Sequence, residues 1–357
     1  METAKGRIAI MGSGETSPSL VSVHRSFAKS LGNHVNAFLI DTPFGFQENA
    51  DVLVDKLKLF FKKSVEIDIN LASFRNKKIV DSVEYFEMLE ELKKSNFIFS
   101  GPGSPSYACK TWQESEIPNL IFDHVIDGKC AVFSSAAAST LGEKAIPVYE
   151  IYKVGMDPYW EKGLNVLKLF GLNCTVVPHF NNKEGGNHDT SCSYIGKKRL
   201  HQLLELEYTN ILGVDEHTAL VIDGAKKTFT VEGLGHVTVV TKVEETIFNS
   251  GNEYELSDLQ SLLPENNKKS KTINQKTTAE TDENTFKKEI AKLNLELKNN
   301  QNYVSLFENT IIKVINLRNI FRNDGKYDES DKIRDLLDEL NIVIEDKEDG
   351  SNWKFKD

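Results

Sequence analysis

The chain has 357 residues, of which 43 are basic and 53 acidic, giving a formal net charge of −10 at pH 7. This length predicts two domains, and the 39% hydrophobic and 27% charged residues are typical of globular proteins. The net charge disfavours a broad nucleic-acid-binding surface but leaves a local basic face open. No apolar run approaches the ~20 residues of a membrane span, and no signal-peptide core is present. We therefore expect a cytoplasmic protein without membrane contact.

The cysteines predict free thiols. There are four of them, without CxxC spacing: Cys109, Cys130, Cys174 and Cys192. This pattern fits a reducing compartment, and it favours neither a disulfide framework nor a metal site. His188 and Cys192 share one polar segment and leave a metal-ligand interpretation open. We otherwise expect no metal and no cofactor.

The first two-thirds of the chain alternates short apolar runs with amphipathic stretches. The predicted strands are Arg7–Met11, Ala37–Asp41, Val65–Ile69, Phe97–Ser100 and Ala131–Phe133. The predicted helices are Ser17–Leu31, Glu48–Lys63 and Ser82–Lys94. This alternation predicts an α/β fold with a mostly parallel sheet flanked by helices on both faces. Ligands bind at the edge where the carboxyl ends of such strands gather.

The later part of the chain changes pattern twice. Closely spaced runs with Gly-containing turns predict antiparallel strands at Ala219–Ile222, Thr228–Val231 and His236–Thr241. A polar stretch without periodicity then predicts a flexible linker over residues 249–285. Helical periodicity returns at Phe286–Leu297, Tyr303–Phe321 and Glu329–Leu340. We therefore predict an α/β domain over 1–248 and a small, mainly helical module over 286–357.

The segment Cys130–Ala138 carries the clearest catalytic signal. An apolar strand leads directly into Ser134, Ser135 and three alanines, and then into a helix. A nucleophile elbow needs small neighbours because its turn is tight, and the following helix supplies N–H groups for an oxyanion. Small residues also let a helix pack closely on a strand, with Ser134 as its N-cap. The segment alone leaves both interpretations open.

Several segments in the same order resemble the cyanophycinase / peptidase E family of serine hydrolases. The family's elbow reads G-x-S-A-G-A, and Phe133–Ala138 match it in register, with Phe133 and Ala137 in place of the two glycines. The other matching segments are Ile8–Glu15, Phe97–Tyr107, Pro178–Phe180, Gly213–Leu220 and Val231–Gly235. The resemblance covers roughly residues 6–243 and implies a class I glutamine amidotransferase-like fold.

The resemblance implies a catalytic triad. Ser135 falls on the nucleophile, His179 on the general base and Glu216 on the acid that orients it. A serine hydroxyl needs an adjacent imidazole to accept its proton, and the imidazole needs a carboxylate to fix its tautomer. Taken singly, His179 and Glu216 read equally as ordinary strand-end and turn residues. Asp215 and His217 are the nearest alternatives.

A glycine-rich loop predicts the oxyanion site. Its donors are expected to be the N–H groups of Ala136 and of the loop Gly101–Gly103, although an ordinary Gly/Pro turn is the alternative. Ser104 and Tyr107 are candidate substrate contacts. The polar segment Asn181–Tyr194 is expected to form a loop over the site mouth.

A short basic run lies further along the chain. Lys197, Lys198 and Arg199 stand nearest to the arginine that follows the histidine in family members. Their side chains either pair with an acidic substrate group or form a solvated helix face.

The end of the chain resembles the C-terminal region of cysteinyl-tRNA synthetases. The matching residues are Arg318, Arg322, Tyr327, Ser330, Asp331, Ile333, Arg334, Asp335, Leu337, Ile342, Asp346, Gly350 and Trp353. The resemblance implies proximity to tRNA, whereas reuse for protein contact or dimerisation is the alternative. The acidic run 346–349 speaks against phosphate binding. The nucleotide-binding half of a synthetase is absent, so aminoacylation is not expected.

Two functions follow from these patterns. The first is a serine-type peptidase or amidase that hydrolyses a peptide or isopeptide bond, with aspartyl and isoaspartyl linkages implied by the resemblance. The second is a non-catalytic relative that binds a ligand, and tRNA or a protein through the C-terminal module. The oligomeric state stays open, a homo-oligomer included.

Overall fold

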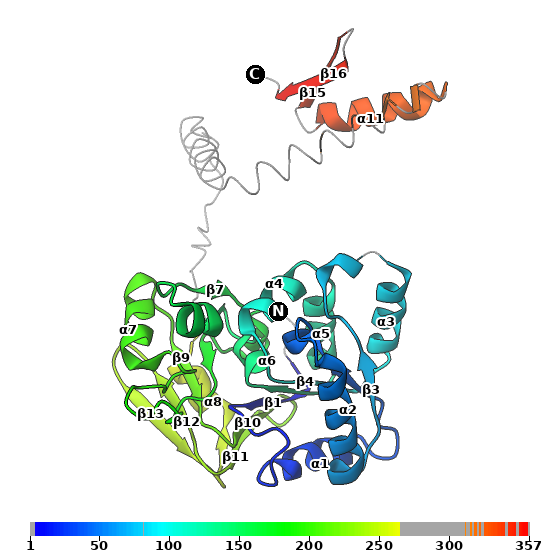
Figure 1. The fold of residues 1–357 in the computed structure, drawn as a ribbon. Helices are drawn as coiled ribbons and strands as arrows, with labels where there is room; N and C mark the ends of the chain where they lie inside the picture. The colour runs from blue at the N-terminus through cyan, green and yellow to red at the C-terminus, as the bar shows by residue number, and fades with distance from the viewer. Residues whose placement is uncertain are drawn as a thin grey trace, which may run out of the picture. The chain divides into compact units, whose positions relative to one another are not determined.

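The structure is a computed structural model that describes residues 4–80, 82–264, 311, 315, 318–319, 321–322, 325–339, 342–347 and 350–355. The chain divides into two compact units, Met1–Ser270 and Lys271–Asp357 (Figure 1). Among the described residues, no helix is both long and apolar enough to cross a membrane. Most of the predicted linker and the predicted helix Phe286–Leu297 lie outside the described residues.

An eight-stranded sheet forms the centre of the first unit, in the order β14-β11-β10-β1-β5-β4-β2-β3. Five neighbouring strands are parallel: β1 (Arg7–Met11), β5 (Cys130–Ser134), β4 (Phe97–Ser100), β2 (Ala37–Ile40) and β3 (Ile69–Ala72). Three antiparallel strands extend the sheet beyond β1: β10 (Thr218–Asp223), β11 (Thr228–Gly233) and β14 (Glu253–Glu255). The mostly parallel α/β architecture predicted from the sequence is confirmed.

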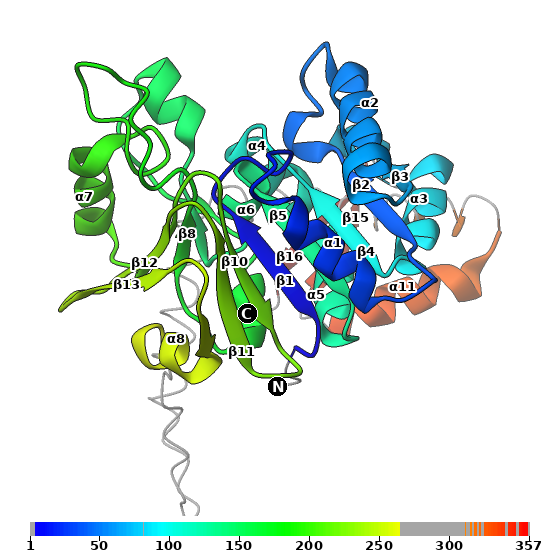
Figure 2. The same ribbon diagram turned by 90° about the horizontal axis from the view of Figure 1, so that it is seen from below.

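Helices pack on both faces of this sheet (Figure 2). One face packs against α1 (Val21–Ser30) and α2 (Ala50–Phe60) through a cluster that includes Phe27 and Phe99. The other face packs against α3 (Val83–Lys93), α4 (Pro105–Gln113) and α5 (Ile117–Ile126) through a cluster that includes Trp112 and Phe133. Strand residues alternate between the two clusters because side chains alternate across a sheet.

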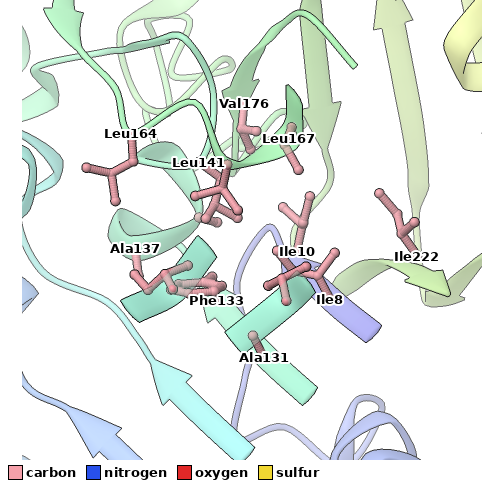
Figure 3. Close-up of a cluster of buried hydrophobic side chains, with 14 of the residues drawn as sticks. Ile8, Ile10, Ala131, Phe133, Ala137, Leu141, Leu164, Leu167, Val176 and Ile222 are labelled. Carbon is pink, nitrogen blue, oxygen red and sulfur yellow. The ribbon is translucent and has the colours of Figure 1, made fainter. Parts of the chain in front are cut away.

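A second sheet of four strands belongs to the same unit, in the order β13-β12-β9-β8. Its strands are β8 (Thr175–Val177), β9 (Ile211–Val214), β12 (His236–Val240) and β13 (Glu245–Asn249). The helix α7 (Gly196–Leu206) precedes β9. The short strands β6 (Lys144–Ala145) and β7 (Glu161–Lys162) pair only with each other, and β6 lies beside β8. Val176 of β8 shares one buried cluster with Ile10 and Phe133 of the large sheet (Figure 3). One continuous core therefore holds the two sheets together.

Two boundaries differ from the predictions. The predicted strand Val65–Ile69 is instead a π-helical turn at Phe61–Val65, followed by β3 from Ile69. Phe61 and Val65 are both buried, so the helical face of α2 continues there and ends at Glu66, whose φ is 70°.

The first unit also extends past the predicted boundary at residue 248. β14 and α8 (Leu256–Leu262) lie inside the segment predicted as linker. Leu256, Leu259 and Leu263 are buried in the main core, so this polar-looking stretch is packed through a few leucines.

The second unit contains α11 (Tyr327–Glu339) and a hairpin of β15 (Ile342–Lys347) and β16 (Gly350–Phe355). Leu337 and Ile342 are buried with Ile311 and Ile315, and Trp353 packs against this cluster. The helix predicted at Glu329–Leu340 corresponds to α11, but no prediction covered β16. β16 shows no apolar alternation typical of a strand, because polar residues dominate Gly350–Phe355.

Candidate active site

The turn between β5 and α6 (Ala136–Ser139) carries Ser135 in a strained conformation. Its φ is 50° and its ψ is −114°, a region that residues with a Cβ rarely adopt. The N–H of Ser135 donates to the carbonyl of Met11 at 3.0 Å, and the N–H of Ala137 donates to the carbonyl of Gly101 at 3.2 Å. Neighbouring strands therefore hold the turn on both sides, and the Ser135 side chain projects beyond the sheet edge into a pocket.

Phe133 occupies the position where the family elbow has its first glycine. It is fully buried in the main core, beside Ala137 and Leu141 in Figure 3. The aromatic ring thus faces the layer beneath the turn. A phenylalanine in place of the family's first elbow glycine is therefore compatible with the strained turn at Ser135.

Ser135, His179 and Glu216 lie in one hydrogen-bonded series. Ser135 Oγ is 2.8 Å from His179 Nε2, and His179 Nδ1 is 2.8 Å from Glu216 Oε1. His179 follows β8 and Glu216 follows β9, whereas Ser135 follows β5. The two sheets therefore supply different members of the series. The structure brings together all three residues that the family resemblance implied.

Two asparagines fix Glu216. Asn182 Nδ2 donates to Glu216 Oε1 at 2.8 Å, and the Glu216 N–H donates to Asn181 Oδ1 at 2.9 Å. The hydrogen bond from His179 lowers the pKa of Glu216, partial burial opposes this effect, and the bond from Asn182 reinforces it. The carboxylate is thereby held in its ionised form beside the imidazole.

A left-handed turn supports His179 from the other side. Cys192, Ser193 and Tyr194 have φ values of 55°, 58° and 69°, and His179 itself has a φ of 49°. Ser193 Oγ donates to the carbonyl of Pro178 at 2.7 Å, and the Tyr194 ring centroid lies 5.0 Å from that of His179. Burial raises the pKa of Tyr194 to about 12, and the negative charges of Glu184 and Glu216 act in the same direction. Its hydroxyl is therefore neutral at physiological pH.

The loop after β4 supplies one predicted oxyanion donor. Gly103 lines the pocket, has a φ of 145°, and a Cβ there would lie 2.0 Å from the carbonyl oxygen of Pro43. Only glycine fits this position. Pro102 has no N–H, and Gly101 lies outside the pocket lining while its carbonyl accepts from Ala137. The N–H groups of Gly103 and Ala136 are thus the two pocket-lining donors of the predicted set.

Ser104 and Tyr107, predicted as substrate contacts, lie outside the pocket lining. Ser104 caps α4 by accepting from the N–H of Tyr107 at 3.2 Å. The Tyr107 hydroxyl donates to the carbonyl of Arg75 at 2.5 Å. Both side chains hold the loop in place, because each has a partner within the protein.

The alternative acids and bases have other contacts. Asp215 is buried, its carboxylate accepts from the N–H of His236 at 2.9 Å, and burial raises its pKa. His217 is exposed, and its ring packs beside Gly14. Neither contacts His179 through a described hydrogen bond, so neither replaces Glu216 in the series.

The pocket beside Ser135 has a volume of about 460 Å³. It is lined by Pro102, Gly103, Pro105, Ser135, Ala136, Ser139, Val148, Tyr149, Tyr152, Lys153, Pro178, His179, Glu184, Ser193 and Tyr194. The segment 181–194 contributes three of these residues, in keeping with its predicted place at the site mouth. Sequence reasoning missed the tyrosine wall at 149 and 152, because no strand-end or glycine signal marks it.

The predicted basic run lies away from this pocket. Lys197 and Lys198 are exposed on α7, and Arg199 donates to the carbonyl of Ile195 at 3.4 Å. None of the three lines the pocket. These residues form a helix face rather than a pairing site for a substrate in this pocket.

His188 and Cys192, which were considered as metal ligands, both pack against other parts of the protein. The His188 ring stacks on Tyr152 with centroids 6.2 Å apart, and Cys192 is buried. In the part of the chain that the structure describes, no three His, Cys, Asp or Glu side chains group as a metal site would require.

Comparison with known proteins completes the description of the site. A peptidase from an acI-B1 Actinobacterium is 21% identical, with a TM-score of 0.58, over 71% of this chain and 98% of that one, which shows a shared fold. A putative peptidase E protein from Listeria monocytogenes EGD-e is 18% identical over 64% of this chain and 99% of that one, with a TM-score of 0.45.

A different relative matches a short part of the chain. The cysteine--tRNA ligase of Ligilactobacillus salivarius (strain UCC118) is 35% identical over 74 residues, which is 21% of this chain and 15% of that protein. By contrast, residues 8–230 match the model of Peptidase family S51. This match covers well over half of the chain and includes the strained serine, the histidine and the glutamate, so the chain belongs to peptidase family S51.

Proposed function

We propose that this protein is a serine peptidase or amidase that cuts a peptide or isopeptide bond through an acyl-enzyme on Ser135. The observation that carries the proposal is the series of two 2.8 Å contacts from Ser135 through His179 to Glu216. It ends at a strained serine that lines a pocket of about 460 Å³. A hydroxyl placed this way has both a base to accept its proton and space for a substrate.

The acylation step uses each contact. With the Nδ1–H of His179 donating to Glu216, Nε2 is free to accept the Ser135 proton. Ser135 Oγ then attacks the carbonyl carbon of the substrate, and the N–H groups of Ala136 and Gly103 stabilise the resulting oxyanion. The tetrahedral intermediate collapses, the C–N bond breaks, and the amine leaves with the proton from His179.

Deacylation repeats the sequence with water. His179 accepts a proton from water, and the hydroxide formed attacks the ester carbonyl. The C–O bond to Ser135 breaks, the carboxylic acid leaves, and the proton on Nε2 returns to Ser135 Oγ. Glu216 stays ionised throughout and stabilises the imidazolium in both steps.

Labelling with a fluorophosphonate tests the proposal directly. We expect wild-type protein to be labelled and Ser135→Ala and His179→Ala to lose labelling. Matched controls are Ser134→Ala, whose hydroxyl donates instead to Glu15 at 2.8 Å, and His217→Ala. Both controls should label like the wild type. Absence of labelling in folded wild-type protein, or persistent labelling of Ser135→Ala, would exclude this mechanism.

A second candidate function concerns the C-terminal unit. Its support is the 74-residue likeness to a cysteine--tRNA ligase, from which we infer a binding role, with tRNA as the first ligand to test. The acidic composition of α11 (YDESDKIRDLLDE) favours a protein ligand instead. Filter binding of tRNA to the full chain and to residues 1–264 across a salt series distinguishes a tRNA ligand from a protein ligand. Binding that weakens with salt and needs the C-terminal unit supports tRNA, and its absence leaves a protein contact.

A further inference from the structure

The pocket beside Ser135 has two walls that come from separate segments of the chain. One wall is the oxyanion loop (Gly101–Gly103) after β4, of which Gly103 lines the pocket. The other wall surrounds the π-helical turn Glu150–Val154. It supplies three pocket-lining residues, namely Tyr149, Tyr152 and Lys153. π-Helical turns are rare and occur frequently at functional sites, so the contacts that hold this turn bear on the shape of the pocket.

Glu150, the first residue of that turn, joins the two walls from behind. It does not line the pocket itself. Ser106 Oγ donates to Glu150 Oε1 at 2.5 Å, and Ser104 Oγ lies 3.0 Å from Ser106 Oγ. Because each hydroxyl donates only one bond, Ser106 accepts from Ser104. Ser104 directly follows Gly103, so this series connects the tyrosine wall to the oxyanion loop.

The connecting series is buried. Ser104 and Ser106 are only 5% and 1% exposed. A hydrogen bond to a carboxylate is stronger than one between neutral groups, and exclusion of water strengthens it further. The Ser104 N–H also donates to the carbonyl of Pro43 at 2.8 Å. The oxyanion loop is therefore held from one side by Pro43 and from the other by Glu150.

The second carboxylate oxygen of Glu150 argues against a purely stabilising role. Within the part of the chain that the structure describes, Glu150 Oε2 is buried and has no hydrogen-bond partner. An unpartnered buried oxygen costs free energy, and an apolar side chain of similar size would avoid that cost. Local costs of this kind are expected at functional sites.

We propose that Glu150 is a positioning residue, which acts through Ser106 to hold the oxyanion loop and the tyrosine wall at a fixed separation. This proposal rests on the proposed function of Ser135. The Gly103 N–H stabilises the oxyanion and so affects the chemical step, whereas the tyrosine wall contacts bound molecules and so affects binding. Loss of Glu150 therefore impairs both.

Labelling kinetics with a fluorophosphonate that carries a phenyl group test this role. Measured against reagent concentration on folded protein, they give a maximal rate constant and a half-saturating concentration. We expect Glu150→Ala to lower the first by about tenfold and to raise the second by about threefold. Glu150→Gln keeps an acceptor for Ser106 and should stay within about twofold of wild type. Wild-type kinetics in Glu150→Ala, or a glutamine variant as slow as alanine, would overturn the proposal.

A double-mutant cycle separates the Ser106 contact from a general loss of packing. Ser106→Ala should resemble Glu150→Ala, and the double variant should label no more slowly than either single variant. Independent effects, which would multiply to about a hundredfold loss, would contradict action through Ser106. Glu161→Ala is the matched control, because its carboxylate contacts Lys110 of the same helix α4 at 3.2 Å. It should label like the wild type.

Hydrogen exchange distinguishes failure of this proposal from failure of the proposed function. In the Ser135→Ala protein, which cannot be labelled there, Glu150→Ala should speed the exchange of amides in both 103–107 and 151–156, and Glu150→Gln should not. Unchanged exchange in Glu150→Ala overturns the role of Glu150 even when the wild type labels normally. Faster exchange in both segments, with no labelling of the wild type, overturns the hydrolase mechanism and leaves Glu150 as the link between the walls.

Discussion

Ser135 combines a positive φ with a side chain that the site needs, so its backbone stores strain. For a residue with a Cβ, such a conformation costs about 1–3 kcal/mol, whereas glycine adopts it readily. The hydrogen bonds that the N–H groups of Ser135 and Ala137 donate to neighbouring carbonyls hold the turn in this conformation. The fold thus accepts a local cost at the residue proposed to react.

Two inactive variants of Ser135 measure that strain. Ser135→Ala keeps the Cβ, and Ser135→Gly removes it. We expect the glycine variant to be more stable to denaturant by about 1 kcal/mol, after allowance for the greater freedom of glycine in the unfolded chain. Equal stability, or a more stable alanine variant, would show that the turn is not strained.

Glu216 is the residue whose protonation links the site to pH. Its folded-state pKa is lowered, first by the hydrogen bond from His179. The resulting stabilisation is present above the unfolded pKa near 4.5 and is lost as the pH falls through the lower folded value. We expect Glu216→Gln to lower the labelling rate by about 10²–10⁴-fold at pH 7.

The pH dependence of the unfolding free energy tests whether the pKa of Glu216 is lowered. The difference in unfolding free energy between wild type and Glu216→Gln should be largest near neutral pH and should shrink below about pH 4.5. A difference that grows on acidification would contradict the lowered pKa.

Sequence reasoning reached Ser135, His179 and Glu216 through the resemblance of their segments to the family, and in the structure each follows a strand. It did not single out Ser139, and it reached Asn182 and Tyr194 only as members of the segment Asn181–Tyr194. Their positions depend on the path of α6 and of the turn at 192–194, and consecutive non-glycine residues with positive φ have no sequence signature. Contacts set by irregular backbone are therefore visible only in three dimensions.

At the scale of elements, the loop between β4 and α4 shows how one glycine sets the site. Gly103 approaches Pro43 so closely that a Cβ would lie 2.0 Å from its carbonyl oxygen, and its φ of 145° is itself unfavourable for alanine. The Ser104 N–H donates to the same carbonyl at 2.8 Å. The loop is therefore pinned to the segment after β2.

Gly103→Ala should displace this loop. We expect a loss of at least about 2 kcal/mol in stability together with a slower labelling rate, because both strain and an oxyanion donor are affected. Gly101→Ala is the matched control. A Cβ there would lie 3.2 Å from the Phe99 ring, so only that side chain has to shift, and the backbone is not in a positive-φ region. Similar effects of the two substitutions would remove the special role of Gly103.

Element boundaries were harder to predict than elements. Periodicity found the parallel strands and the helices that cover them, since burial enforces a regular pattern there. It failed at Val65–Ile69, where apolar residues suit a strand but continue a helix, and at residues 253–262, where only a few leucines pack. In both places a short apolar signal fits more than one structure, and tertiary packing decides.

At the scale of the whole molecule, the first unit needs its last helix. Leu259 and Leu263 are fully buried, the N–H of Asn173 donates to the carbonyl of Leu263 at 2.9 Å, and Gln260 donates to the carbonyl of Phe170 at 2.9 Å. A chain ending at Pro264 retains these contacts, whereas a chain ending at Asn249 loses them all.

We expect residues 1–264 to fold and to label at Ser135 like the full chain. Residues 1–249 should be less stable by several kcal/mol, at about 2–5 kcal/mol per lost buried leucine, or fail to fold. Circular dichroism, denaturant unfolding and labelling compare the two. If 1–264 loses labelling, the C-terminal unit contributes to the active site, and if 1–249 matches 1–264, α8 is dispensable.

Two buried histidines make the whole unit sensitive to acid. Burial lowers the pKa of both His24 and His124 to about 4, against a backbone hydrogen bond that raises each. Because the unfolded chain binds the proton more readily, stability is full above about pH 6.5 and falls as the pH drops toward 4, by roughly 3 kcal/mol per histidine.

Substitution tests this acid sensitivity. His24→Gln should flatten the dependence of the unfolding midpoint on pH between 6.5 and 4, and the exposed His201→Gln should not. A parallel pH dependence in wild type and His24→Gln would rule out the contribution of His24.

The catalytic series is divided between the two sheets, so the reactivity of Ser135 depends on how the sheets are aligned. Ser135 follows a strand of the large sheet, while His179 and Glu216 follow strands of the small one. A displacement of only about 1 Å between reacting groups can cost 10²-fold in rate. If one sheet slid against the other, Ser135 would lose its contact with His179 and become unreactive, although every strand would still be paired with its neighbour. Reactivity toward a fluorophosphonate therefore reports on the alignment of the two layers. It should disappear at denaturant concentrations where backbone amides of β1 and β5 are still protected from hydrogen exchange.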